Sequence, residues 1–153
     1  MIERVLSGGQ TGVDRAALDA AREAKIAISG WCPRGRRAED GAISERYPLI
    51  ETPSAGYAQR TEWNVRDADG TLILNRGALE RGTALTVRMA SRWGKPRLTI
   101  ELQNPPSAKV VLDWFTEDGI RVLNIAGPRE GQRPGIYAEA LEFLHAVFSM
   151  IGN

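Results

Sequence analysis

Residues 4–18, RVLSGGQTGVDRAAL, combine a short apolar run, a glycine-rich turn and the start of a helical pattern. Apolar residues then recur at helical spacing as far as Ala24, in an alanine-rich segment with high helix propensity. A strand that passes through glycines directly into a helix is typical of an α/β protein. The segment therefore predicts the first strand at residues 4–6 and the first helix at residues 13–24.

The same alternation continues to the end of the chain. A loop-rich stretch from Trp31 to Gly56 interrupts it and carries one brief predicted strand near residues 47–51. The other predicted strands cover residues 26–28, 71–74, 97–102 and 122–126, and the other predicted helices cover residues 57–68, 83–92, 107–116 and 137–151. Short apolar strands between helices favour a parallel sheet covered on both faces. We expect a single domain over residues 1–153, with a Rossmann-like three-layer α/β sandwich and a mostly parallel sheet of about five strands.

Composition excludes several classes of partner. The chain has 153 residues, 42% of them apolar and 25% charged, and its formal net charge is +1. This balance gives no basic field for nucleic acid or an anionic membrane, and no apolar run approaches the roughly 20 residues that span a bilayer. One cysteine and one histidine allow neither a disulfide framework nor a metal site built on several of these residues. We expect a cytoplasmic protein without a nucleic-acid partner, a membrane partner or a metal site of its own.

Four glycine-rich segments follow the predicted strands. Because parallel strands end at one edge of a sheet, where open α/β folds bind ligands, these segments are expected to meet there. They cover residues 7–15, 31–37, 76–83 and 127–135. Arginine supplies 17 of the 20 basic residues, and codon bias explains such an excess as well as oxyanion recognition does. The excess becomes informative only where arginines fall within these segments.

The first segment is a candidate oxyanion cradle. Glycines allow the backbone to approach a ligand closely, and a helix N-terminus supplies free N–H groups and partial positive charge. Its spacing fits neither the dinucleotide-binding GxGxxG motif nor the Walker A loop. Asp14 suits a ligand contact, and equally a structural acid in the first helical turn. The candidate binding residues of this segment are Gly8, Gly9, Gln10, Thr11, Gly12, Asp14 and Arg15.

The other three segments add candidate contacts. Clustered arginines after the second strand suit a phosphate or a molybdate-like oxyanion, although a solvated basic face explains them as well. A glycine and a threonine at the start of a helix offer amides and a hydroxyl to an anion. The candidates are Arg34, Gly35 and Arg36 in the second segment, Gly82 and Thr83 in the third, and Gly127 and Arg129 in the fourth.

Four stretches together resemble the molybdenum carrier family: residues 7–18, 30–41, 60–69 and 126–130. The likeness extends over nearly the whole chain. It implies a Rossmann-like fold related to lysine-decarboxylase-like nucleotide-binding domains. The implied role is to bind and protect the pterin-based molybdenum cofactor, and the implied assembly is a homo-oligomer, either a dimer or a tetramer.

The wider superfamily includes LOG-type phosphoribohydrolases, which cleave a nucleoside 5′-monophosphate at its N-glycosidic bond. By this resemblance Arg60 takes the place of their helical arginine, and Gly82 and Thr83 take the place of their Gly-Thr pair. Thr86 stands where their catalytic glutamate would be, so hydrolysis would need another acid, such as Glu62 or Asp14. The sequence therefore favours a non-enzymatic carrier of a small anionic, phosphate-bearing pterin or nucleotide-like ligand, with the hydrolase as the alternative. A third interpretation is a small regulatory or interaction domain with a vestigial pocket.

Overall fold

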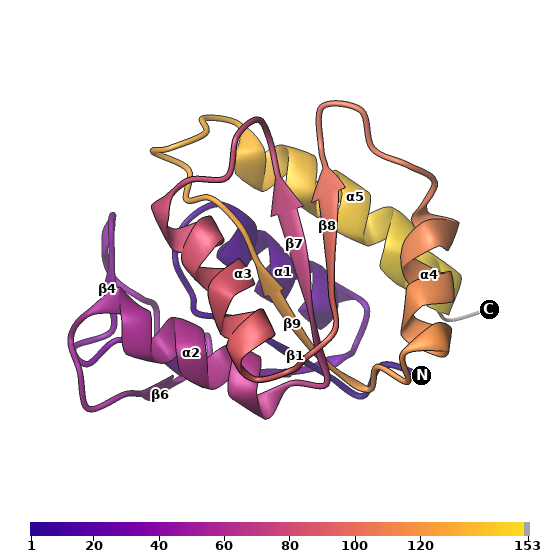
Figure 1. Cartoon of the computed structure of the whole chain (residues 1–153). Coiled ribbons are helices and arrows are strands. Elements are labelled where there is room, and N and C mark those ends of the chain that lie inside the picture. Colours follow the sequence, from indigo (N-terminus) through magenta and orange to yellow (C-terminus); the bar gives the residue numbers. More distant parts are fainter. Residues whose placement is uncertain (152–153) are drawn as a thin grey trace.

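The computed structural model describes residues 1–151 and contains a central five-stranded sheet (Figure 1). Its strand order is β2-β1-β9-β7-β8, and the pairings along it are parallel. The strands are β1 (Arg4–Leu6), β2 (Ala27–Ser29), β7 (Gly70–Asn75), β8 (Arg97–Glu101) and β9 (Val122–Ala126). The prediction of a three-layer α/β sandwich with a parallel sheet of about five strands is confirmed.

Within residues 1–151, five helices cover the two faces of this sheet. They are α1 (Val13–Glu23), α2 (Tyr57–Asp67), α3 (Arg81–Arg92), α4 (Ala108–Glu117) and α5 (Ile136–Ile151). Helix α5 packs against α1 and α4 on one face, whereas α2 packs against α3 on the other (Figure 1). No helix within residues 1–151 has the length and apolarity needed to cross a membrane.

The helix and strand predictions are confirmed to within a few residues. The strand at residues 122–126 matches β9, and Ser107 caps α4 by accepting a hydrogen bond from the Lys109 amide at 3.2 Å. For the loop-rich stretch at residues 31–56, the sequence predicted one strand, which is fewer than the structure contains. It contains the four short strands β3 (Trp31–Cys32), β4 (Arg37–Ala38), β5 (Gly41–Ala42) and β6 (Ile50–Glu51). Each has only two residues, which is too short for a hydrophobic period to mark.

The two faces of the sheet differ in polarity. Leu72, Leu74 and Ile125 belong to the large apolar core shared with α1, α4 and α5. Side chains alternate along a strand, so their neighbours Thr71 and Asn124 face α2 and α3, where Asn124 donates a hydrogen bond to the Thr71 hydroxyl at 3.2 Å. One face of the sheet therefore packs into the large apolar core, and the other face carries polar side chains such as Thr71 and Asn124.

The strand order has a simple relation to the Rossmann order. If the strands are counted from β9 and the chain is continued from α5 into β1, the sheet has the order 3-2-1-4-5. The helices after β9 and β7 lie on opposite faces, so the chain diverges between these two strands. Open α/β sheets bind their ligands in the crevice at this point.

Candidate functional site

A cavity of about 470 Å³ lies at this crevice, over the carboxyl ends of β1 and β9 and against α2 and α3. The volume falls within the range of roughly 300–1,000 Å³ that is usual for small-molecule sites. Its lining includes Gly8, Asp14, Arg60, Thr83, Asn124 and Arg129. The polar face of the sheet thus forms the floor of the cavity.

The N-terminus of α3 opens into the cavity through Arg81, Gly82 and Thr83. No side chain caps this helix end. Thr83 is only 4% exposed, and its hydroxyl has no hydrogen-bond partner within residues 1–151. First-turn amides lack partners inside a helix and carry partial positive charge. This end of the cavity is therefore suited to an anion.

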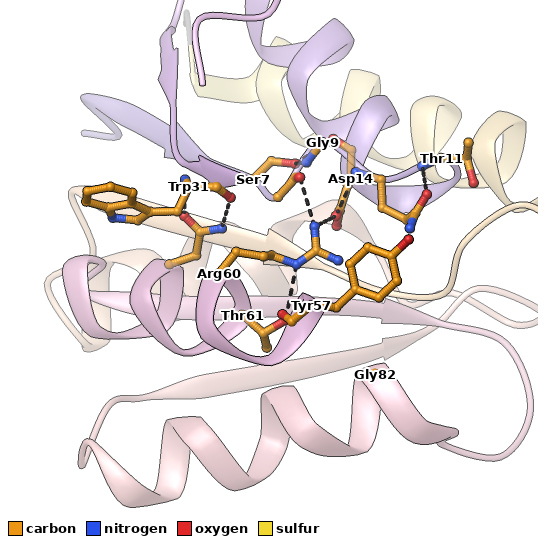
Figure 2. Close-up of polar contacts among 12 residues, drawn as sticks. Ser7, Gly9, Thr11, Asp14, Trp31, Tyr57, Arg60, Thr61 and Gly82 are labelled. Atoms are coloured by element: carbon orange, nitrogen blue, oxygen red, sulfur yellow. Dashed lines mark hydrogen bonds and ion pairs between the residues drawn. The ribbon is translucent and has the colours of Figure 1, made fainter. Parts of the chain in front are cut away.

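Arg60 extends from α2 across the cavity toward the loop after β1 (Figure 2). Its Nη1 donates to the Gly8 carbonyl at 2.8 Å, its Nε donates to the Thr61 hydroxyl at 3.3 Å, and its guanidinium lies 5.1 Å from the centre of the Tyr57 ring. A Cβ atom on Gly8 would lie 2.4 Å from Arg60 Nη1. Glycine at position 8 thus makes room for the arginine, which is held in place before any ligand arrives.

Asp14 faces Arg60 from the first turn of α1 (Figure 2). Its Oδ2 lies 3.7 Å from Arg60 Nη1 and accepts a hydrogen bond from the Gln10 amide at 3.1 Å. Burial raises the pKa of Asp14 to about 6, and the positive charge of Arg60 only partly offsets this effect. The structure therefore keeps an ionisable acid, with a pKa near neutrality, in the wall of the cavity.

The N-terminus of α1, the predicted cradle, is covered. The Val13 amide donates to the Pro128 carbonyl at 3.2 Å, and the Glu130 amide donates to the Thr11 hydroxyl at 3.1 Å. A Cβ atom on Gly12 would lie 2.5 Å from the Pro128 carbonyl oxygen. Gly12 and Thr11 thus serve the packing of the loop after β9, and the open helix N-terminus at the cavity belongs to α3.

The predicted site residues divide into two groups. Those that line the cavity are Gly8, Gln10, Asp14, Arg60, Gly82, Thr83, Gly127 and Arg129. Those outside its lining are Gly9, Thr11, Gly12, Arg15, Arg34, Gly35, Arg36 and Glu62. The loop after β1, the start of α3 and the loop after β9 therefore meet, whereas the arginine cluster after β2 does not reach the cavity.

Two of the outlying arginines have structural partners. Arg15 forms a bidentate pair with Asp40, with N–O distances of 2.7 and 2.8 Å, and donates to the Gly9 carbonyl at 3.0 Å. The guanidinium of Arg36 donates to four backbone carbonyls, those of Ile43, Ser44, Tyr47 and Leu49. This fixes the loop before β6, so the Arg36 donors are not directed at a ligand.

The residues considered for hydrolysis are only partly assembled. Arg60 lines the cavity, but Glu62 accepts a hydrogen bond from Trp93 Nε1 at 3.1 Å and lies 3.9 Å from an Arg92 nitrogen, outside the lining. Thr86 lines the cavity and donates its hydroxyl to the Gly82 carbonyl at 3.0 Å. No carboxylate stands on this wall of α3, and Asp14 is the acid that lines the cavity.

Several lining residues were not among the candidate binding or catalytic residues named from the sequence. They are Tyr57, Thr61, Asn64, Arg81, Leu85, Thr86, Arg88, Asn124, Ile125, Ala126 and Gln132. One signal was present in the sequence, because Asn124 is a polar residue inside the apolar run of β9. Arg81 and Arg88 are seven residues apart, which places them on the same face of α3.

No group of three or more His, Cys, Asp or Glu residues within residues 1–151 could hold a metal ion. Cys32 is buried, and burial raises the pKa of its thiol. Cys32 also lies outside the cavity lining. The main polar groups of the site are therefore the guanidinium, amide and hydroxyl groups of the lining residues.

Comparison with known proteins gives the family. Residues 5–148 match the model of the Circularly permutated YpsA SLOG family. The chain belongs to this family. It is also similar to a solved structure of a protein from Syntrophus aciditrophicus SB that is named Putative molybdenum carrier protein, with a TM-score of 0.93 and 46% sequence identity over 95% of this chain and 94% of that chain. No curated protein matches the chain.

The permutation in the family's description agrees with the strand order. Moving β9 and α5 to the front of the chain gives the Rossmann order 3-2-1-4-5. The resemblance to molybdenum carriers drawn from the sequence is thereby confirmed at the level of family and fold.

Proposed function

We propose that this protein is a carrier that binds a phosphate-bearing heterocyclic molecule in the cavity beside α3. The molybdenum cofactor, a pterin with a phosphate group, is the leading candidate cargo, and a nucleotide is its closest chemical alternative. The observation that carries the proposal is the unpartnered hydroxyl of Thr83, a residue only 4% exposed that lines the cavity at an uncapped helix N-terminus. The name of the Syntrophus aciditrophicus protein supports the choice of cargo.

The charges around the α3 N-terminus favour a phosphate there. Glu80, the N-cap residue, does not cap the helix with its side chain, and its charge is paired with Arg133, whose Nη2 donates to a Glu80 oxygen at 2.9 Å. Arg81, in the first turn of α3, lines the cavity, and Arg129 adds a second guanidinium to its lining. A helix N-terminus and guanidinium groups are the usual protein partners of phosphate. We assign the phosphate of the ligand to this end of the cavity.

The size and polarity of the cavity favour an organic molecule over a bare oxyanion. A volume of about 470 Å³ exceeds what a phosphate or molybdate ion fills. Asn124 lines the cavity, and its amide oxygen can accept a hydrogen bond from the edge of a heterocycle, whereas its amide nitrogen donates to the Thr71 hydroxyl. Asn64 also lines the cavity, but both of its amide atoms are bound to the backbone of Trp31. Since Cys32 lies outside the lining, the protein contributes hydrogen bonds and positive charge to such a cargo.

A pair of threonine variants tests the proposal. Binding is measured by calorimetry with inorganic phosphate and guanosine monophosphate, and by a thermal shift with molybdenum cofactor released from a molybdoenzyme. Thr83→Val is expected to weaken binding by about 10- to 100-fold, the worth of one hydrogen bond to a charged group. Thr116→Val makes the same chemical change on α4, whose contacts lie on the opposite face of the sheet, and is expected to leave binding unchanged.

Three results would contradict the proposal that the protein is a carrier. The first is the absence of saturable binding of every probe by the wild type. The second is a Thr83→Val variant that binds like the wild type, because the anion would then lie elsewhere. The third is release of free base from nucleoside monophosphates, which would favour the hydrolase over the carrier.

A further inference from the structure

The cavity proposed for an anion contains one side chain that opposes it. Its lining includes the arginines Arg60, Arg81, Arg88 and Arg129, and Asp14 is its only acidic residue within residues 1–151. An ionised carboxylate repels a phosphate, so a site that takes anions alone is better without it. Asp14 is also only 7% exposed, and burying a carboxylate opposes folding. A carboxylate that opposes both phosphate binding and folding is therefore expected to make a favourable contact with another part of the ligand.

The surroundings of Asp14 leave one oxygen free. Gln10 and Arg60 both approach Oδ2, and no residue within residues 1–151 donates a hydrogen bond to Oδ1. An ionised carboxylate accepts hydrogen bonds on both oxygens and donates none. The free oxygen on the wall of the cavity therefore suits a hydroxyl or N–H group.

The pair is also rigid before a ligand binds. Arg60 is fixed by the Gly8 carbonyl, by the Thr61 hydroxyl and by the Tyr57 ring (Figure 2). Asp14 is fixed from the other side by the backbone of the loop after β1. Groups that are held in place lose little freedom on binding, so a hydrogen bond to them contributes more to affinity.

We propose that Asp14 is the selectivity residue of the site: its free oxygen accepts a hydrogen bond from a hydroxyl or N–H group on the body of the ligand, while Arg60 holds it in place. The proposal rests on the proposed function, which puts the phosphate at the N-terminus of α3. It defines the ligand class as phosphate esters whose body carries hydrogen-bond donors, as sugars and pterin or purine rings do. Bare phosphate, pyrophosphate and molybdate are bound poorly.

The test compares the wild type with Asp14→Asn by calorimetry at pH 7.5. The probes are inorganic phosphate, ribose 5-phosphate, guanosine monophosphate and its 2′,3′-dideoxy analogue. We expect Asp14→Asn to lose about 10- to 100-fold in affinity for guanosine monophosphate, the range for a hydrogen bond to a charged group. Its affinity for inorganic phosphate should rise, because a repelling charge is removed. A merely structural role would weaken both.

The four probes separate the two sources of the donor. If the ribose hydroxyls bind Asp14, ribose 5-phosphate shows the loss and the dideoxy analogue does not. If the ring N–H groups bind it, the reverse holds. Asp113→Asn, on the exposed surface of α4, is the matched control and should bind every probe like the wild type.

A second variant examines the same pair without altering either charge. A methyl group added in Gly8→Ala would overlap the Arg60 guanidinium, which must then move away from Asp14. We expect this variant also to bind guanosine monophosphate more weakly, with an unchanged melting temperature to within a few degrees. If Asp14→Asn folds poorly, the Gly8→Ala variant still tests whether the Asp14–Arg60 pair determines selectivity.

The outcomes distinguish this proposal from the proposed function. If Asp14→Asn and Gly8→Ala keep the wild-type preference for guanosine monophosphate over inorganic phosphate, the selectivity proposal is wrong and the carrier stands. If Thr83→Val has no effect on any probe, or the wild type binds none of them, the phosphate site itself is wrong and the role of Asp14 fails with it.

Discussion

The burial of Asp14 makes the stability of the fold depend on pH. The pKa of a free aspartate is 3.8, and in the folded protein burial raises the pKa of Asp14 to about 6. The folded state therefore binds more protons than the unfolded state between these values, so this residue lowers the free energy of unfolding as pH rises. The penalty is absent below about pH 4 and complete above pH 6. A difference of about two pKa units corresponds to about 3 kcal/mol.

Asp14→Asn should therefore stabilise the apoprotein at neutral pH. We expect an increase in the free energy of unfolding of about 1–3 kcal/mol at pH 7.5, measured by urea denaturation, because asparagine can still accept the Gln10 amide and carries no charge to bury. The gain should shrink as pH falls through 6 and vanish near pH 4. A gain that does not vary with pH would show that the charge of Asp14 is not its cause. Asp113→Asn, on the surface, should show no such pH-dependent difference.

At the scale of elements, the hairpin formed by β4 and β5 restrains an arginine of the site. Glu39, at the tip of this hairpin, pairs with Arg129 at 3.2 Å and accepts a hydrogen bond from the Gly131 amide at 2.8 Å. The Thr11 hydroxyl also donates to Glu39. The hairpin thus neutralises part of the positive charge that Arg129 offers to the cavity.

Glu39→Gln should strengthen the binding of inorganic phosphate. Removing the negative charge leaves Arg129 uncompensated, and we expect the affinity to rise about 2- to 5-fold at low salt, with a smaller gain at high salt because partly exposed charges are screened. Calorimetry at two salt concentrations measures both effects. Asp40→Asn removes a charge from the same hairpin tip but one paired with Arg15 outside the cavity, and it should change little. Weaker binding by Glu39→Gln would mean that Glu39 positions Arg129 rather than competing for it.

The elements also show which parts of the site local sequence can predict. The apolar run at residues 122–126 and the glycine-rich loop after β1 are local patterns, so β9 and the edge of the sheet where the cavity lies were predicted. The closure of the α1 N-terminus depends on Val13 meeting Pro128, residues far apart in sequence, and no local pattern records it. The contacts of Arg36 escape local sequence for a related reason, since its partners are backbone carbonyls that any residue supplies.

At the scale of the whole molecule, the strand order predicts a viable rearrangement of the chain. Ile2 and Ile151 line the same small hollow with Phe115, so the ends of the described chain lie close together. The turn before β9 contains Gly119, where a Cβ atom would meet nothing within 4 Å, so the chain can be opened there without disturbing packing. Exposed turns of this kind tolerate new termini.

A permutant that starts at Gly119 and joins residue 153 to residue 1 through a short glycine-serine linker should fold. We expect its circular dichroism spectrum and its affinity for guanosine monophosphate to match the wild type, and its free energy of unfolding to differ by about 2 kcal/mol or less, because every strand pairing is kept. A permutant opened inside α2, between Arg60 and Thr61, is the control expected to lose binding. Failure of the first permutant to fold would show that the present connectivity is itself required.

The central position of β9 also sets the order in which the sheet can be completed during translation. β1 pairs with β2 and β7 pairs with β8, but these two strand pairs meet only through β9, which is translated after the other four strands of this sheet. Until residue 126 has emerged, a nascent chain holds two separate parallel pairs whose inner edges expose unpaired backbone groups. Such edges are prone to aggregation. A premature stop before β9 would therefore remove the join between both halves of the sheet, and with it the floor of the cavity.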